Sequence, residues 1–113
     1  MIDHEARTGF IETIGRRSGL PRETQIGFAT DGARIFAIAS HGDAADWVKN
    51  LRANPAVRFR IGETWHVGAV RIATDPEEEA SIREAMLAKY TGGRIGTDWI
   101  RTGLALVIDP ARP

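Results

Sequence analysis

The sequence contains no cysteine, so disulfides, thiol catalysis and thiolate metal sites are excluded. It also has no apolar run near the roughly 18 residues that a membrane-spanning helix needs. Its first residues, Met1 to Glu5, lack the basic start and apolar centre of a signal peptide. These absences predict a cytoplasmic protein without a transmembrane segment.

Excess charge is absent as well, because fifteen Lys and Arg side chains balance fifteen Asp and Glu side chains. A balanced chain with few aromatic residues among its arginines argues against nucleic-acid binding. The three histidines, His4, His41 and His66, are scattered without matching carboxylates, which argues against a metal site. The balance is local, however, since Arg16, Arg17 and Arg22 stand close together.

Hydrophobic periodicity and turn residues predict six strands and two main helices. The strands are expected at residues 10–14, 23–30, 33–39, 56–61, 65–73 and 104–108, and the helices at residues 43–54 and from Pro76 to about Tyr90. Asp43 is the expected cap of the first helix, Asp31-Gly32 is a turn signal, and Gly68 is a candidate bulge. Tight turns between strands favour a mainly β, α+β fold: one small antiparallel barrel over residues 1–113.

The stretch from Thr13 to Arg22 holds three arginines, a serine and two glycines in ten residues. Glycines permit unusual backbone conformations, exposed amides in such a turn can hold an anion, and arginine forks suit phosphate or carboxylate oxygens. The segment is therefore a candidate site for an anionic group, most simply part of a cofactor. A solvated basic hairpin turn is the alternative of similar weight.

Three segments together resemble the deazaflavin-dependent nitroreductase family, within the split β-barrel flavin-binding group. They are Thr13-Ile14-Gly15-Arg16-Arg17-Ser18-Gly19-Leu20-Pro21-Arg22, then Ala39-Ser40-His41-Gly42-Asp43, then Asp46-Trp47-Val48-Lys49-Asn50-Leu51-Arg52-Ala53-Asn54-Pro55. Family members often carry lysine where His41 stands, and tyrosines near the substrate are not evident because Tyr90 is the only tyrosine. These departures leave the cofactor in place and put the substrate in question.

The resemblance implies a split β-barrel that binds coenzyme F420, a deazaflavin with a ribityl phosphate and an acidic polyglutamate tail. FMN is the alternative cofactor. The cofactor-binding residues that it implies are Gly15, Arg16, Arg17, Ser18, Gly19, Pro21, Arg22, Ala39, Ser40, His41, Gly42, Asn50 and Asn54. Asn50 and Asn54 either contact the cofactor or hold the helix, and His41 is the candidate proton donor.

The expected activity is hydride transfer from reduced F420 to a quinone, a nitroaromatic or an unsaturated carbonyl compound. The alternatives are an FMN-binding oxidoreductase and a protein that carries or sequesters F420 without catalysis. A homodimer and a peripheral association with the membrane also stay open. Trp47 is either a core anchor or a stacking partner, Trp65 is either core or dimer contact, and the segment from Gly92 to Trp99 is either a lid or core.

Overall fold

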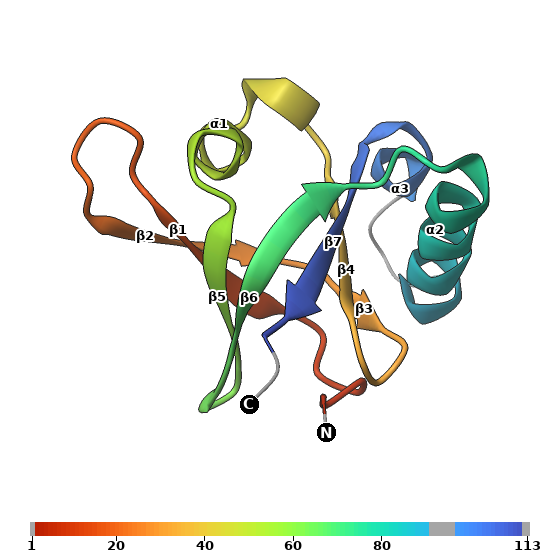
Figure 1. The fold of residues 1–113 in the computed structure, drawn as a ribbon. Helices are drawn as coiled ribbons and strands as arrows, with labels where there is room; N and C mark the ends of the chain where they lie inside the picture. Colours follow the sequence, from red (N-terminus) through yellow and green to blue (C-terminus); the bar gives the residue numbers. More distant parts are fainter. Residues whose placement is uncertain (1, 91–96, 112–113) are drawn as a thin grey trace.

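The computed structural model describes residues 2–90 and 97–111. The elements in chain order are β1 (Gly9–Ile14), β2 (Pro21–Ile26), β3 (Ala29–Thr30), β4 (Ile35–Ala39), the 3₁₀ turn η1 (Gly42–Ala44), α1 (Asp46–Ala53), β5 (Ala56–Ile61), β6 (Thr64–Ile72), α2 (Pro76–Tyr90), α3 (Asp98–Thr102) and β7 (Leu104–Pro110). Figure 1 shows α1 at one end of a curled sheet and α2 with α3 on the opposite side.

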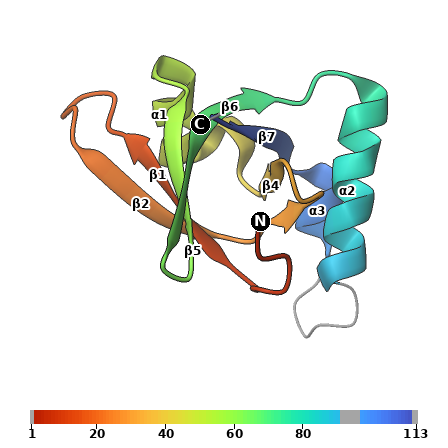
Figure 2. The same cartoon turned by 60° about the horizontal axis from the view of Figure 1, so that its bottom comes forward.

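The seven strands form one antiparallel sheet in the order β2-β1-β5-β6-β7-β4-β3. Its two edge strands, β2 and β3, are consecutive in the chain and are separated only by Gly27 and Phe28. The chain therefore crosses directly from one edge of the sheet to the other, which curls the sheet into a half barrel (Figures 1 and 2). The predicted α+β antiparallel split barrel with two main helices is confirmed.

Two hydrophobic clusters lie on opposite faces of β4 and β7. Inside the curl, Leu51 of α1 packs with Phe59 and Leu106, while on the other face Ile82 and Met86 of α2 pack with Val107. All five residues of β4 are buried, as its continuous apolar sequence predicted. A strand covered on both faces needs such a sequence, whereas β5 alternates between buried and exposed residues because only one face is covered.

Several predicted details are wrong. The single strand expected over residues 23–30 is two strands, because Phe28 donates its backbone N–H to the Tyr90 hydroxyl (2.9 Å) where the chain crosses between edges. The first helix begins at Asp46 rather than Asp43, and Asp43 makes no capping bond but pairs with Arg52. Gly68 marks no bulge, since its pairing on both sides is continuous.

Gly68 has another role, because a Cβ atom there would lie 2.3 Å from the Asp109 carbonyl oxygen of β7. Helix α3 was not predicted. Its Ile100 is fully buried in the cluster under α2, and Trp99 packs edge-on to Tyr90 with ring centroids 6.0 Å apart. Of the candidate lid, Gly92 to Trp99, residues 92–96 lie outside the described residues.

Candidate functional site

The β1–β2 connection is a compact turn closed by its own backbone. The Gly15 N–H donates to the Leu20 carbonyl (2.9 Å), and the Gly19 N–H donates to the Gly15 carbonyl (2.8 Å). Gly19 has φ of +72°, which favours glycine, and a Cβ atom on Gly15 would lie 2.6 Å from the Ser18 Oγ. Gly19 is thus required by the backbone and Gly15 by the position of the Ser18 hydroxyl, in a turn that holds Arg16 and Arg17 at the surface.

A buried amide fixes one of these arginines. The Asn50 Oδ1 of α1 accepts hydrogen bonds from the Arg16 backbone N–H (3.1 Å) and from Arg16 Nη1 (2.9 Å). Its Nδ2 donates to the Oγ1 of Thr13, a residue with no exposed surface (3.3 Å). Asn50 therefore ties the turn, the first helix and the sheet together, which accounts for a polar side chain that is only 6% exposed.

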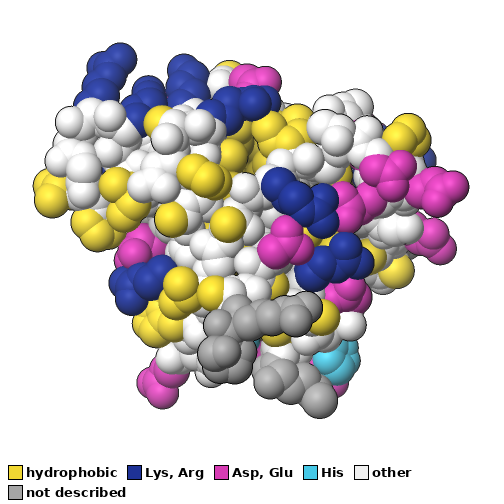
Figure 3. Space-filling model, in the orientation of Figure 1, with side chains coloured by type: hydrophobic (Ala, Val, Ile, Leu, Met, Phe, Trp, Pro, Cys, Tyr) yellow, Lys and Arg dark blue, Asp and Glu magenta, His cyan; other side chains and the backbone are white. Residues whose placement is uncertain are grey.

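Strand alternation brings two further polar residues to the same place. Arg22 pairs with Thr13 and Thr24 pairs with Ile11, so all four side chains lie on the face of the ribbon that turns toward α1. The result is a pocket of about 420 Å³ lined by Gly15, Arg16, Arg17, Ser18, Arg22, Thr24, Asp46, Trp47 and Asn50. Lys and Arg side chains gather at this end of the molecule (Figure 3).

The pocket contains cations that the protein does not neutralise. The side chains of Arg17 and Arg22 make no hydrogen bond or ion pair with any residue in the ranges 2–90 and 97–111, and the same holds for the side chains of Lys49 and Arg101. Asp46 is the only acid among the described lining residues, and it reaches Arg16 alone, at 3.4 Å. An exposed guanidinium pair beside backbone amides is a suitable binding site for phosphate or carboxylate groups.

Six of the predicted site residues meet in this pocket: Gly15, Arg16, Arg17, Ser18, Arg22 and Asn50. Gly19 and Pro21 belong to the same hairpin without lining the pocket. Ser18 also accepts a hydrogen bond from the Leu20 N–H (3.2 Å), so its hydroxyl helps to shape the turn.

The other predicted residues lie before and after α1. Ala39 is buried at the end of β4, Ser40 and His41 connect it to η1, which begins at Gly42, and His41 is exposed. Asn54 ends α1, where its Oδ1 accepts from the Ala56 N–H (3.1 Å), so its described contact holds the helix end. None of these residues lines the 420 Å³ pocket.

Three lining residues stand outside the predicted cofactor-binding set: Thr24 and Asp46, which were not predicted, and Trp47, which was predicted as either a core anchor or a stacking partner. Two signals could have found them. Thr24 stands two residues after Arg22 and so shares its face of a strand, and Asp46 and Trp47 stand four and three residues before Asn50 on one helix face. Trp47 also packs against the inner core, so it is a core anchor and a pocket wall together.

Within the described part of the chain, no helix is long and apolar enough to cross a membrane, and no group of acidic and histidine side chains is arranged to hold a metal ion. The curated F420H(2)-dependent quinone reductase of Mycobacterium tuberculosis is 34% identical over 55 residues, which are 46% of this chain and 37% of that protein. The chain thus matches little more than a third of that relative's length.

Two solved structures share the fold. One, described as an F420-H2 dependent reductase, has a TM-score of 0.74 and 18% identity over 91% of this chain and 94% of its own. The other, described as a domain-swapped dimer, has a TM-score of 0.76 and 18% identity over 93% and 81% of the two chains. A sequence model described as F420H(2)-dependent quinone reductase matches residues 5–109, which include the arginine turn, α1 and all of the barrel except the last residue of β7. The chain therefore belongs to this family, whose cofactor is reduced F420.

Proposed function

We propose that this chain binds reduced F420 in the pocket between the β1–β2 turn and α1, and that it transfers a hydride to a quinone or another small organic acceptor. The observation that carries the proposal is the pair Arg17 and Arg22, two pocket cations without a partner among the described residues. Family membership identifies the anion that such a pair would serve.

The residues fit an anionic cofactor in a definite way. Arg17 and Arg22 would contact its phosphate or carboxylate groups, while Arg16 is already oriented by Asn50. Trp47 offers an apolar wall, and the family resemblance places the Ala39–Gly42 segment, which leads toward α1, along the cofactor. When bound, reduced F420 supplies the hydride, and the protein's task is to hold the acceptor about 3–3.5 Å from the ring.

Titration with F420 and with FMN, followed by fluorescence, tests the cofactor assignment. We expect tighter binding of F420, since its acidic tail offers more anionic groups to the arginines than the single phosphate of FMN. Equal affinity for the two would favour the FMN-binding oxidoreductase. No response to F420 at micromolar concentration would reject the cofactor proposal.

Turnover with reduced F420 tests the reaction. A panel of quinones, nitroaromatics and unsaturated carbonyl compounds should yield at least one acceptor whose consumption matches cofactor oxidation. Tight binding without oxidation across the panel would favour the carrier instead.

His41→Ala should lower the rate less than about a hundredfold, because water can replace a general acid here. Complete loss of turnover with binding intact would make His41 a required acid.

We further propose that residues 1–113 act as one domain in the cytoplasm and that two copies pair as a homodimer. The absence of cysteine is compatible with that compartment. Exposed Trp65 and Val67 on the outer face of β6 are candidate contacts, and one structure with this fold is a dimer. Sedimentation of the full chain measures the oligomeric state, and Trp65→Ser should shift it toward monomer.

A further inference from the structure

Asp46 is a negatively charged residue in a pocket whose other charged lining residues are arginines. It lies on the first turn of α1, its side chain is 84% exposed, and its Oδ1 is 3.4 Å from Arg16 Nη2. The other terminal nitrogen of the same guanidinium, Nη1, donates to the Oδ1 of buried Asn50 at 2.9 Å. Arg16 thus has one fixed partner and one loosely held partner, and the loose partner is the carboxylate.

We propose that Asp46 competes internally with the anionic part of the cofactor for Arg16, and so lowers cofactor affinity and speeds cofactor release. This inference rests on the proposed function. A carboxylate or phosphate that approaches Arg16 must displace Asp46, and it is repelled by the same charge while it stays bound. Arg17 and Arg22 lack such a competitor among the described residues.

Fast release suits a reductant that is consumed in each cycle. After hydride transfer the oxidised cofactor has to leave before a reduced molecule can enter, and product release limits many enzymes. A pocket with three uncompensated arginines would hold a polyanion longer. Asp46 offsets one of these charges from the edge of the pocket, where its own side chain is exposed to solvent.

The competing explanation is structural. An acid in the first turn of a helix is stabilised by the helix dipole, and α1 has no side-chain cap at Ala45. In that case Asp46→Asn would lower the melting temperature and leave cofactor affinity unchanged. Affinity and release rate therefore separate the two roles.

The test compares Asp46→Asn with Asp43→Asn, which removes the same charge three residues earlier, where the carboxylate pairs with Arg52 outside the pocket. F420 affinity is measured by fluorescence and release by stopped flow, at low and high salt. We expect Asp46→Asn to tighten binding about two- to fivefold, as for one exposed charge pair. The gain should appear in slower release and should shrink with added salt.

Unchanged or weaker binding by Asp46→Asn overturns the inference, and so does an equal gain by Asp43→Asn, which would show a general charge effect. If the natural sequence binds no F420, the proposed function fails, and inorganic tripolyphosphate becomes the probe. Tighter tripolyphosphate binding by Asp46→Asn, but not by Asp43→Asn, would still support competition at Arg16. No difference between the variants would reject it.

Discussion

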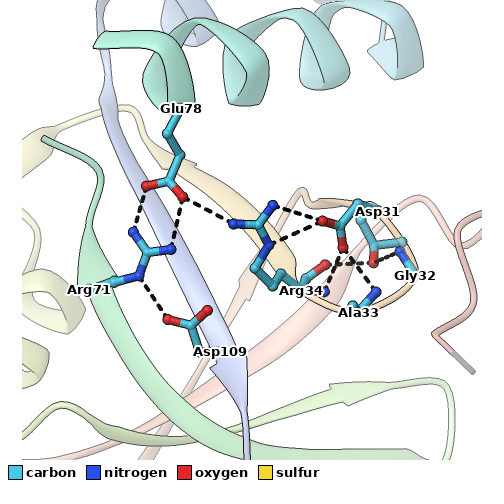
Figure 4. Close-up of polar contacts among 8 residues, drawn as sticks. Asp31, Gly32, Ala33, Arg34, Arg71, Glu78 and Asp109 are labelled. Atoms are coloured by element: carbon cyan, nitrogen blue, oxygen red, sulfur yellow. Dashed lines mark hydrogen bonds and ion pairs between the residues drawn. The ribbon is translucent and has the colours of Figure 1, made fainter. Parts of the chain in front are cut away.

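Arginines are used in opposite ways at the two ends of this molecule. Between the sheet and α2, Arg71 pairs with Glu78 and with Asp109, and Arg34 pairs with Glu78 and with Asp31 (Figure 4). The pocket under the β1–β2 turn has three arginines and, among its described lining residues, one acid, which contacts only Arg16, at 3.4 Å. The first arrangement joins elements of the fold, and the second leaves charge available to a ligand.

The difference shows why a net charge of zero is a poor guide to this protein. Hydrogen bonds from Arg71 lower the pKa of the Glu78 carboxyl, and its two carboxylate partners raise the pKa of Arg71, so the network stays ionised at neutral pH. The acids Asp31, Glu78 and Asp109 pair with arginines that join elements of the fold. The pocket arginines therefore carry positive charge that the zero net charge of the chain does not reveal.

Both arrangements depend on a fixed α1 and an intact core, so the largest effect should come from Leu51→Asp. Leu51 is 3% exposed in the inner cluster, and a carboxylate there should cost more than the roughly 2–5 kcal/mol of a Leu→Ala change. Urea unfolding followed by circular dichroism measures it. Lys49→Asp on the exposed face of the same helix is the control, and equal loss in both would refute the packing of α1.

Arg17→Ala tests the pocket arginines whose side chains have no partner among the described residues. A charge-assisted hydrogen bond to an anion is worth about 1.5–3 kcal/mol, so F420 affinity should fall about tenfold or more while stability is unchanged. Arg58→Ala is the matched variant, because Arg58 is paired with Glu12 on the outer face of the sheet. Equal binding by Arg17→Ala and the natural sequence would remove the distinction between the two classes.

Asn50→Ala should affect both stability and cofactor binding, because Asn50 is a buried structural residue that also orients Arg16 in the pocket. Loss of a buried hydrogen-bonded amide should lower the free energy of unfolding by about 1–3 kcal/mol. It should also weaken F420 binding through Arg16. In a double-mutant cycle with Arg16→Ala, the two binding losses should not add. Additive losses would mean that Asn50 contacts the cofactor itself.

Arg71→Ala should reverse the pattern of Arg17→Ala. Its side chain is 44% exposed, so the loss of folding free energy should be no more than about 1 kcal/mol, and F420 affinity should not change. Thermal unfolding and fluorescence titration on one preparation measure both quantities. Weaker F420 binding by this variant would show that the two ends of the molecule are coupled.

Lys89 is an intermediate case, a half-buried cation whose Nζ donates to the Phe28 carbonyl (2.8 Å). Burial, with help from Arg7, lowers its pKa from about 10.5 to about 8. The unfolded chain therefore binds more protons between these values, and stability should rise as pH increases from about 8 to 9.5. Chemical denaturation across this range should show the rise, and Lys89→Met should abolish it while Lys49→Met should not.

The sequence predicted much of this structure where the signals were local. The arginine turn, the alternation of Val57, Phe59 and Ile61, and the proline start of α2 all depend on neighbouring residues. The break at Gly27 and Phe28 was missed because its cause is distant in sequence: a Cβ atom on Gly27 would meet the Tyr90 hydroxyl at 2.9 Å. Alternation inside a strand cannot show that the strand must end.

The pocket was predicted in part for the same reason. The turn arginines formed one recognisable segment, but Thr24 and Asp46 join them only through strand pairing and the approach of α1. The start of α1 was predicted three residues too early because aspartate is a common helix cap, whereas the carboxylate of Asp43 forms an ion pair with Arg52 instead. Whether the Asp43 carboxylate caps a helix or pairs with Arg52 depends on which group lies near it in the folded protein, and the sequence does not show that.

The crossing at Gly27 and Phe28 has a mechanical consequence for the pocket. The β1–β2 ribbon extends from the barrel (Figures 1 and 2), and the Tyr90 hydroxyl holds its base by accepting from the Phe28 N–H (2.9 Å) and donating to the Arg7 carbonyl (2.6 Å). Arg22 lies six residues before Phe28, a distance of about 20 Å along an extended strand. A rotation of about 5° at Phe28 would move Arg22 by about 2 Å over such an arm. The Tyr90 hydroxyl, together with the pairing of β1 with β5 from Phe10 to Glu12, therefore holds the ribbon at the angle at which it presents its arginines.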